Sequence, residues 1–123
     1  MVHTRMIEKL KRLPAKFYKS KNGSEPVREW LCELDREDRK LIGTDIMDVE
    51  FSWPTGMPLC RPLDHGLWEV RNNITGKRIA RVIFYVKGNE MILLHGFVKK
   101  TQKIPDHEKK LARKRKKEHE KHG

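Results

Sequence analysis

The chain has 123 residues, of which 37% are hydrophobic and 37% are charged, so it is long enough for one domain with a modest core. Its formal net charge of +11 favours a polyanionic partner such as RNA, DNA, a ribosome or an acidic protein. No apolar run approaches the ~18–20 residues that span a bilayer and no hydrophobic signal core is present, so we expect a cytoplasmic protein without membrane contact.

The positive charge is concentrated late in the sequence. From residue 99 onward there are eleven Lys/Arg and four Asp/Glu, a net charge of +7, whereas the first 98 residues carry +4. This basic segment is either a surface for a polyanion or a solvated, frayed helix. Cys32 and Cys60 are isolated and have no zinc-type spacing, which is typical of free thiols in a reducing compartment. We therefore expect no metal and no cofactor.

The first half of the chain predicts a short strand and two helical segments. Residues 1–12 are polar and basic and form a flexible lead. Residues 15–19 read as an edge strand, because flanking lysines discourage strand addition. Apolar residues recur at helical spacing over 26–34, and Asp35 can cap a second helix over 36–51. The pair is a helical hairpin or one bent helix.

The second half predicts three strands and a final helix. Residues 59–64 are either an extended segment or a loop. Strands are predicted over 67–72, 78–87 and 91–98, with a turn-rich link over 73–77 and a hairpin turn at Gly88 and Asn89. Residues 106–120 have high helix propensity, but only Leu111 and Ala112 are apolar anchors, so a helix there is marginal by itself.

The predicted fold class is α+β, in a single domain over residues 1–123. We expect an antiparallel β-meander of three to four strands with the N-terminal helical hairpin packed on one face. Residues 106–123 then form a basic C-terminal helix or tail.

One charged residue interrupts the predicted middle strand. Because side chains alternate along a strand, Arg81 shares a face with the apolar residues Ile79, Ile83 and Tyr85. A guanidinium among apolar neighbours is costly without a partner. Its partner is either a carboxylate such as Glu69 or the phosphate of a ligand, which suits the planar donors of arginine.

The basic residues around this sheet face could bind RNA and stabilise the extra negative charge of a pentacoordinate transition state. Proton transfer would also require a base and an acid, for which histidine is the usual residue. Two histidines bracket the end of the third strand. His95 lies within the apolar strand and is typical of a satisfied core histidine.

Three segments carry a resemblance to a known family: LWEVR at 67–71, RIARVIFY at 78–85 and LLHGFVKKTQKIP at 93–105. Together they resemble the RelE/ParE toxin superfamily and are most similar to its phage-related HigB-like branch. The resemblance covers about residues 13–115. It implies a RelE-like domain that acts as the toxin of a type II toxin–antitoxin system.

The resemblance also implies an activity, partners and site residues. The expected activity is ribosome-dependent, metal-independent mRNA cleavage, and the expected partners are the ribosome, mRNA and a HigA-like helix-turn-helix antitoxin. The implied catalytic residues are Arg71, Arg81 and Lys100. The resemblance also implies a tyrosine or histidine shortly after the last strand as acid or base, and His107 is the candidate there. We expect RNA binding by the neighbouring basic residues Lys99, Lys103, Lys109, Lys110, Arg113, Lys114 and Arg115. The alternatives are a ParE-like gyrase inhibitor and a non-catalytic nucleic-acid-binding module.

Overall fold

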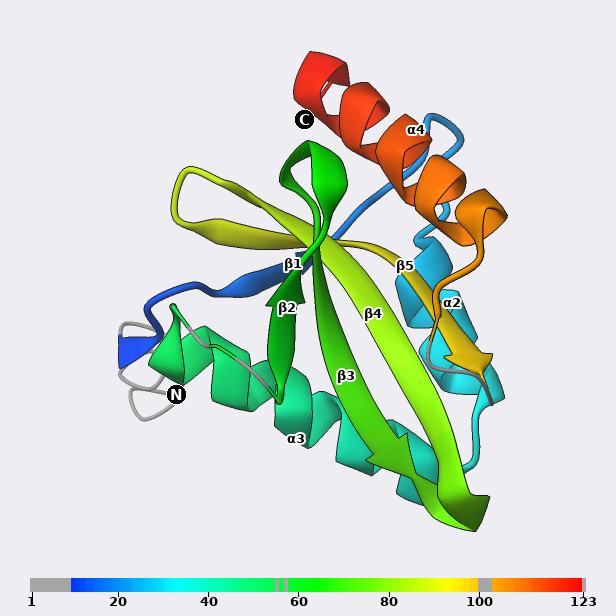
Figure 1. The fold of residues 1–123 in the computed structure, drawn as a ribbon. Coiled ribbons are helices and arrows are strands. Elements are labelled where there is room, and N and C mark those ends of the chain that lie inside the picture. Colours follow the sequence, from blue (N-terminus) through cyan, green and yellow to red (C-terminus); the bar gives the residue numbers. More distant parts are fainter. Residues whose placement is uncertain (1–9, 55, 57, 100–102, 123) are drawn as a thin grey trace.

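The computed structural model describes residues 10–54, 56, 58–99 and 103–122, which adopt an α+β fold (Figure 1). Its α-helices are α2 (Pro26–Glu33), α3 (Arg36–Ser52) and α4 (Asp106–His122). Its strands are β1 (Ala15–Phe17), β2 (Cys60–Pro62), β3 (Trp68–Ile74), β4 (Arg78–Lys87) and β5 (Glu90–Lys99). Within this described part of the chain, no helix is both long enough and apolar enough to cross a bilayer.

The sheet has five strands in the order β1-β5-β4-β3-β2. β2, β3, β4 and β5 pair antiparallel, but β1 pairs parallel with β5. The prediction of a purely antiparallel meander of three to four strands is therefore wrong. The meander itself is present, and the two short edge strands extend it on both sides. Strand propensity could not reveal the parallel pair, because it indicates that a strand exists and not which strand it pairs with.

The two turns of the meander follow the predicted chemistry. Gly88 takes a φ of +60° in the β4–β5 turn, a conformation that glycine adopts without steric cost. The β3–β4 link is a single 3₁₀ turn over Thr75–Lys77, in which Gly76 has a φ of +71°. β3 extends to Ile74, two residues beyond the predicted end.

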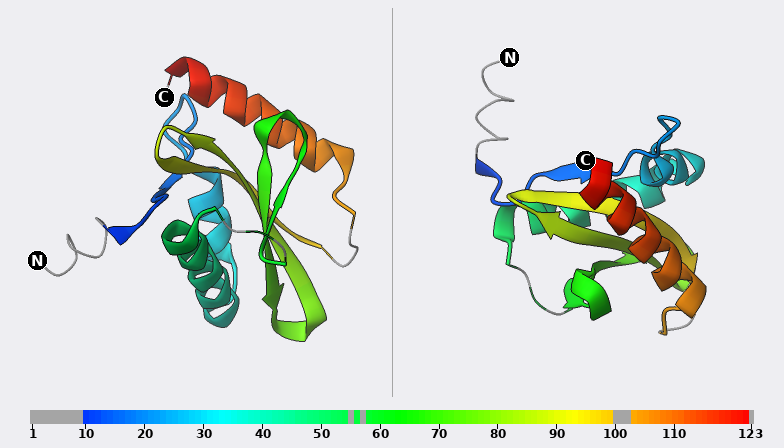
Figure 2. Two further views of the ribbon diagram at one scale, coloured as in Figure 1. Left: turned by 60° about the vertical axis from the view of Figure 1, so that its left-hand side comes forward. Right: turned by 90° about the horizontal axis from the view of Figure 1, so that it is seen from above.

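One face of the sheet is covered by α2 and α3 (Figures 1 and 2). The predicted helical region is two separate helices, divided at Leu34 and Asp35. Their apolar stripe packs against the β4 residues Ala80, Val82 and Phe84. The contact is close at Gly96 of β5, where an added Cβ would lie 2.3 Å from the Trp30 ring. Trp53 also packs against this core, with its ring 4.9 Å from that of Trp68.

The opposite face carries α4, so the helices lie on both sides of the sheet (Figure 2). Ala112 of α4 is buried there with Ile83, Tyr85 and Leu94. The alternative of a solvated tail does not describe α4, whose inner face packs over β4 and β5. The apolar pattern failed to reveal this docking because most of the contacts that α4 makes are polar and aromatic.

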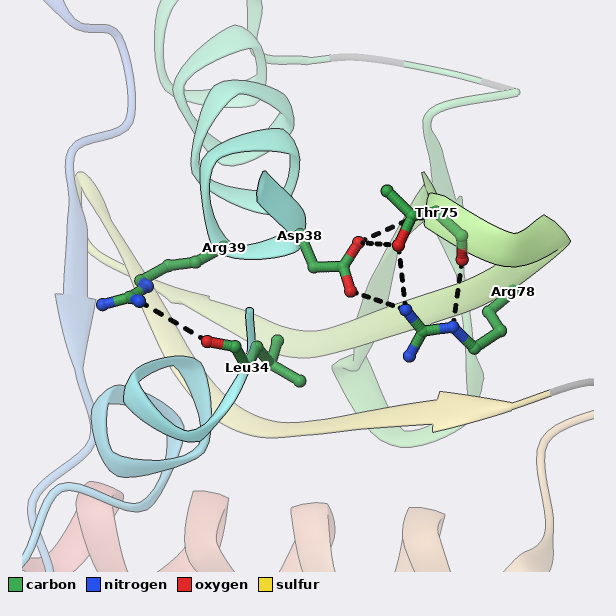
Figure 3. A network of polar contacts seen from close by, with 5 residues as sticks. All are labelled: Leu34, Asp38, Arg39, Thr75 and Arg78. Carbon is green, nitrogen blue, oxygen red and sulfur yellow. Dashed lines mark hydrogen bonds and ion pairs between the residues drawn. The ribbon is translucent and has the colours of Figure 1, made fainter. Parts of the chain in front are cut away.

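A buried aspartate ties the start of α3 to the β3–β4 turn (Figure 3). One carboxylate oxygen of Asp38 accepts hydrogen bonds from the Thr75 hydroxyl at 2.7 Å and the Thr75 amide at 3.0 Å. The other accepts from Arg78 at 2.6 Å. The Thr75 hydrogen bonds, with help from the Arg78 charge, lower the pKa of Asp38. This network fixes the end of the β3–β4 hairpin relative to the helical layer.

Candidate nucleic-acid interface

The strand register places three of the predicted site residues on one face of the sheet. Arg71 of β3 is the cross-strand partner of Arg81 of β4, and Arg81 is in turn the partner of Phe97 of β5. In the next row, Asn73, Ile79 and Lys99 are partners. Alternation puts all of these side chains on the α4 side of the sheet. Arg71, Arg81 and Lys99 therefore share a face, and Lys99, which was predicted to follow the third strand, is the last residue of β5.

The partner of Arg81 is a carboxylate, which was one of the two predicted alternatives. Its Nη1 donates to both oxygens of Glu69, at 2.8 and 2.9 Å, and only 1% of Arg81 and 2% of Glu69 is exposed. Arg61 of β2 donates to the same Glu69 at 2.8 Å, and 42% of its side chain is exposed. We call Arg61, Glu69 and Arg81 the Glu69 cluster. A guanidinium this deeply buried is inaccessible to a ligand unless the surrounding structure moves.

Sequence reasoning missed Arg61. An extended segment over residues 59–64 was one of the two predicted alternatives, and its pairing with β3 brings Arg61 opposite Glu69. Nothing in the sequence indicated that pairing. With Arg71 beside it, this part of the sheet face has three arginines and one carboxylate, an excess of two positive charges. Such an excess attracts an anion such as phosphate.

Arg71 points to the edge of the sheet. It lines a groove of about 430 Å³ with Leu41, Asp45, Pro58, Leu59 and Asn73. Arg71 is half-buried, and its side chain has no hydrogen bond or ion pair with any other described residue. The groove lies between α3 and the end of β3, so Arg71 is shared between the sheet face and its edge.

A second hollow lies where β5 leads into α4. It has a volume of about 410 Å³ and is lined by Lys99, Lys103, Ile104, Pro105 and Asp106. The Lys99 ammonium donates to the Lys103 carbonyl, which draws the two basic residues together. The predicted site residue Lys100 lies outside the described residues. We call this feature the Lys99 hollow.

The two histidines near this hollow have different environments. His95 of β5 contacts the inner face of α4. Its Nδ1 lies 3.3 Å from the Arg115 guanidinium, and its Nε2 lies 2.8 Å from Glu108. A guanidinium can only donate, so Nδ1 accepts and Nε2 donates to Glu108. Burial lowers the pKa of His95. His95 is thus a satisfied packing histidine, as predicted, and remains neutral near pH 7.

The candidate acid or base, His107, is open to solvent. Its side chain is 78% exposed, and its Nε2 lies 3.6 Å from the same Glu108 oxygen that His95 contacts. Glu108 is held in place by His95, so it presents a fixed carboxylate to His107. At 3.6 Å the two groups are not hydrogen-bonded, so Glu108 provides a nearby negative charge to His107 without fixing its ring.

The outward face of α4 is a row of cations. Lys110, Arg113, Lys114, Lys117 and Lys121 recur at helical spacing and, with His65, line a broad hollow of about 870 Å³. Three of the predicted RNA-binding residues, Lys110, Arg113 and Lys114, belong to this row. Lys109 is half-buried in the first turn of the helix.

Arg115 is the predicted RNA-binding residue that faces inward instead. Its Nη1 donates to the Leu94 carbonyl at 2.8 Å, and its guanidinium lies 5.9 Å from the centre of the Tyr18 ring. Leu94 is the extra residue of an irregularity in the β4–β5 ladder, where Ile83 pairs with His95 and Phe84 with Leu93. Arg115 therefore satisfies a carbonyl at the bulge and anchors α4 to the sheet.

Comparison with known proteins supplies a family. Residues 29–117, which is more than half of the chain, match the family model "Phage derived protein Gp49-like (DUF891)". No curated protein matches the chain. The matched range includes α3, the whole meander, the Lys99 hollow and most of α4. The narrower HigB-like branch stays a prediction. The chain thus belongs to the Gp49-like family of phage-derived proteins, a RelE-like family of toxin–antitoxin systems.

Proposed function

We propose that this protein is the toxin of a type II toxin–antitoxin system and that it cleaves mRNA on the ribosome without a metal ion. The observation that carries the proposal is the arrangement of cations on one side of the molecule. The Lys99 hollow leads directly into α4, whose outward row continues the positive charge. Family membership and the segment at residues 93–105 support the toxin role. The basic row suits an RNA backbone, since phosphate contacts dominate such binding.

We assign roles in RNA binding and cleavage to the basic residues according to how exposed their side chains are. Arg61, Arg71 and Lys99 are partly exposed, so we assign them to the phosphates of the RNA. Arg81 is almost fully buried and acts by positioning: it holds Glu69, which in turn holds Arg61. Lys103 and the outward row of α4 bind flanking phosphates. Lys100 keeps the catalytic role that the resemblance implies.

Cleavage requires two proton transfers. A base takes the proton of a 2′-hydroxyl, the 2′-oxygen attacks the neighbouring phosphorus, and the 5′-oxygen leaves with a proton from an acid. His107 serves as one of these two groups, with the Glu108 carboxylate 3.6 Å away. The cations stabilise the negative charge that develops on the phosphorane. A HigA-like helix-turn-helix antitoxin neutralises the protein.

A second function has one specific observation in its favour. The guanidinium of Arg81, the most central basic residue, is bonded to Glu69 rather than open to a ligand. A protein that only binds nucleic acid would need no more than the outward row of α4. This alternative predicts ribosome or RNA binding without any new RNA ends.

The test is primer extension on mRNA in a translating extract. The wild-type protein is expected to generate new 5′ ends on the mRNA. His107→Ala is expected to reduce the cleavage rate about 100-fold or more, because general acid–base catalysis contributes at least that factor. Its affinity for the ribosome should not change. Arg36→Ala is the control, because it changes an exposed side chain of α3 on the opposite side of the sheet. Translation that stops without new ends would support the binding alternative, and inhibited gyrase would support the ParE-like one.

A further inference from the structure

A fourth hollow lies at the far end of α4, between its last turns and the loop that follows β1. It has a volume of about 270 Å³, and the residues that line it include Phe17, Lys19, Ser20, Lys21, His119 and His122. None of these residues belongs to the site described above. We call it the Phe17 hollow.

The loop side of this hollow is built from its own hydrogen bonds. The Ser20 amide donates to the Ser24 carbonyl at 2.8 Å, and the Ser24 amide donates to the Ser20 hydroxyl at 3.2 Å. Gly23 closes the turn with a φ of +88° and donates its amide to the Ser20 carbonyl at 3.0 Å. The loop therefore has a defined shape without a ligand, as a preformed binding site requires.

Tyr18 fastens this loop to the rest of the protein. Its amide donates to the Leu93 carbonyl at 3.0 Å, and its hydroxyl donates to the Glu118 carboxylate. Burial and the nearby Glu118 raise the pKa of Tyr18 to about 12, so the hydroxyl keeps its proton and remains a donor. The two walls of the hollow, one from the loop and one from α4, are thus joined.

The charges in the hollow favour an anion. Lys19 and Lys21 are exposed, and neither ammonium has an ion-pair partner among the described residues. Glu118 is the acidic residue in the lining, and it accepts the Tyr18 hydrogen bond. Burial lowers the pKa of His119, so the positive charge of the hollow comes from the two lysines. The hollow therefore carries a net positive charge next to an aromatic ring, because Phe17 is 36% exposed.

An exposed aromatic ring beside two lysines suits one nucleotide, with its base stacked on the ring and its phosphate between the ammonium groups. The outward row of α4 leads toward this hollow from the Lys99 hollow. The 17 residues of α4 span roughly 25 Å at ~1.5 Å per residue. That distance corresponds to about seven stacked nucleotides at ~3.4 Å each.

We propose that the Phe17 hollow is a second nucleotide-binding site, which takes a base and phosphate of single-stranded RNA several positions from the cleaved bond. The inference rests on the proposed function, because it assumes that RNA follows α4. It adds a substrate-length requirement that the Lys99 hollow and the α4 row do not impose by themselves.

Fluorescence anisotropy with two labelled, non-cleavable 2′-O-methyl oligouridylates tests the proposal, one of four nucleotides and one of ten. The full-length wild-type protein is expected to bind the longer strand about tenfold more tightly, since one stacked base contributes ~1–3 kcal/mol. Phe17→Leu and the double variant Lys19→Ser/Lys21→Ser should lose this gain and still bind the shorter strand like the wild type. The lysine variant should also lower the salt slope for the longer strand by about 0.7, because one phosphate contact is lost.

The matched control is Arg36→Ser/Lys40→Ser, which removes two exposed cations from α3 on the other side of the sheet. The proposal is wrong if the Phe17 hollow variants keep the length-dependent gain, or if they weaken both strands to the same extent as the control does. It is also wrong if they weaken antitoxin binding alone, which would make the hollow a protein-docking site. A wild-type protein that binds neither strand would instead remove the RNA-binding function itself.

Discussion

At the scale of single residues, the Glu69 cluster shows how one carboxylate organises the basic face. Glu69 and Arg81 are both nearly inaccessible to solvent, and their ion pair is bidentate. Taking two charges out of water is costly, and good geometry offsets that cost only in part. Arg61 reaches the same carboxylate from the exposed side. The cluster thus connects a buried charge to the surface where we place the RNA.

Removing either member of the buried pair should destabilise the fold. Arg81→Ala and Glu69→Ala are each expected to lower the free energy of unfolding by about 3–5 kcal/mol, because the remaining charge is buried with too few partners. Arg61→Ala should cost only about 1 kcal/mol, since its side chain is partly solvated. Urea unfolding of the three variants measures these differences. Equal stability of Arg81→Ala and the wild type would show that the ion pair does not hold the fold.

The sequence made part of this cluster predictable. The alternation in β4 set Arg81 among apolar residues, and the cost of that position indicated a carboxylate partner, with Glu69 as the example. Arg61 was not predictable, because its place depends on pairing between β2 and β3 over only three residues. Lys99 was predicted to follow the third strand, whereas β5 includes it, and the extra residue Leu94 brings its side chain to the same face as Arg71.

At the scale of elements, α4 is docked mainly through polar and aromatic contacts. Arg115 donates to the Leu94 carbonyl, and the Tyr85 hydroxyl lies 2.5 Å from His119. Lys116 lies 5.4 Å from the centre of the Tyr85 ring. A sequence pattern reveals a helix by its apolar stripe, and α4 has only two apolar residues for that stripe. The helix was predictable from propensity, whereas its packing face was not. The partner of β1 was likewise hidden, because a three-residue strand carries no information about its neighbour.

The docking of α4 should weaken in mild acid. Burial lowers the pKa of His95 below its ordinary value of about 6.5. Below pH 6.5 the unfolded chain binds a proton at this histidine more readily than the folded protein does. The contribution of His95 to the free energy of unfolding is therefore complete above pH 6.5 and decreases as the pH falls below that value. The groups facing His95 include Glu108, which opposes this effect, and Arg115 and His107, which add to it.

Thermal melts between pH 7.5 and 5.5 measure this effect. The wild-type protein should lose several degrees of Tm across the range. His95→Gln keeps a donor toward Glu108 but cannot titrate, so its Tm should change less. Asp38 and Glu118 have lowered pKa values and lose their contributions only at more acidic pH. Identical pH profiles for the variant and the wild type would exclude His95 as the source of the acid sensitivity.

At the scale of the whole molecule, the sheet separates two surfaces with different roles. The α2–α3 face forms the larger apolar core, and its outer side holds charges of both signs. The α4 face has the smaller core, the Glu69 cluster, the Lys99 hollow and the outward row of cations. α4 contributes to both stability and charge, with inward Arg115 and Glu118 and outward Lys110, Lys114 and Lys117. Deleting the helix would mix these two effects, whereas substitution of the outward residues alone separates them.

The last prediction follows from that separation. The triple variant Lys110→Ser/Lys114→Ser/Lys117→Ser removes three outward charges and keeps the contacts described above that dock α4, so its Tm should stay within a few degrees of the wild type. If each lysine contacts one RNA phosphate, the slope of log affinity against log salt should fall by about 2, at ~0.7 per phosphate of a single strand. Affinity measured from 50 to 300 mM salt gives that slope, with Arg36→Ser/Lys40→Ser as a variant that loses charge on the opposite side. A slope that falls equally in both variants would mean that RNA senses the net charge of the protein and not the α4 surface. An unchanged slope in the triple variant would move the RNA away from α4, toward Arg71 and the sheet edge.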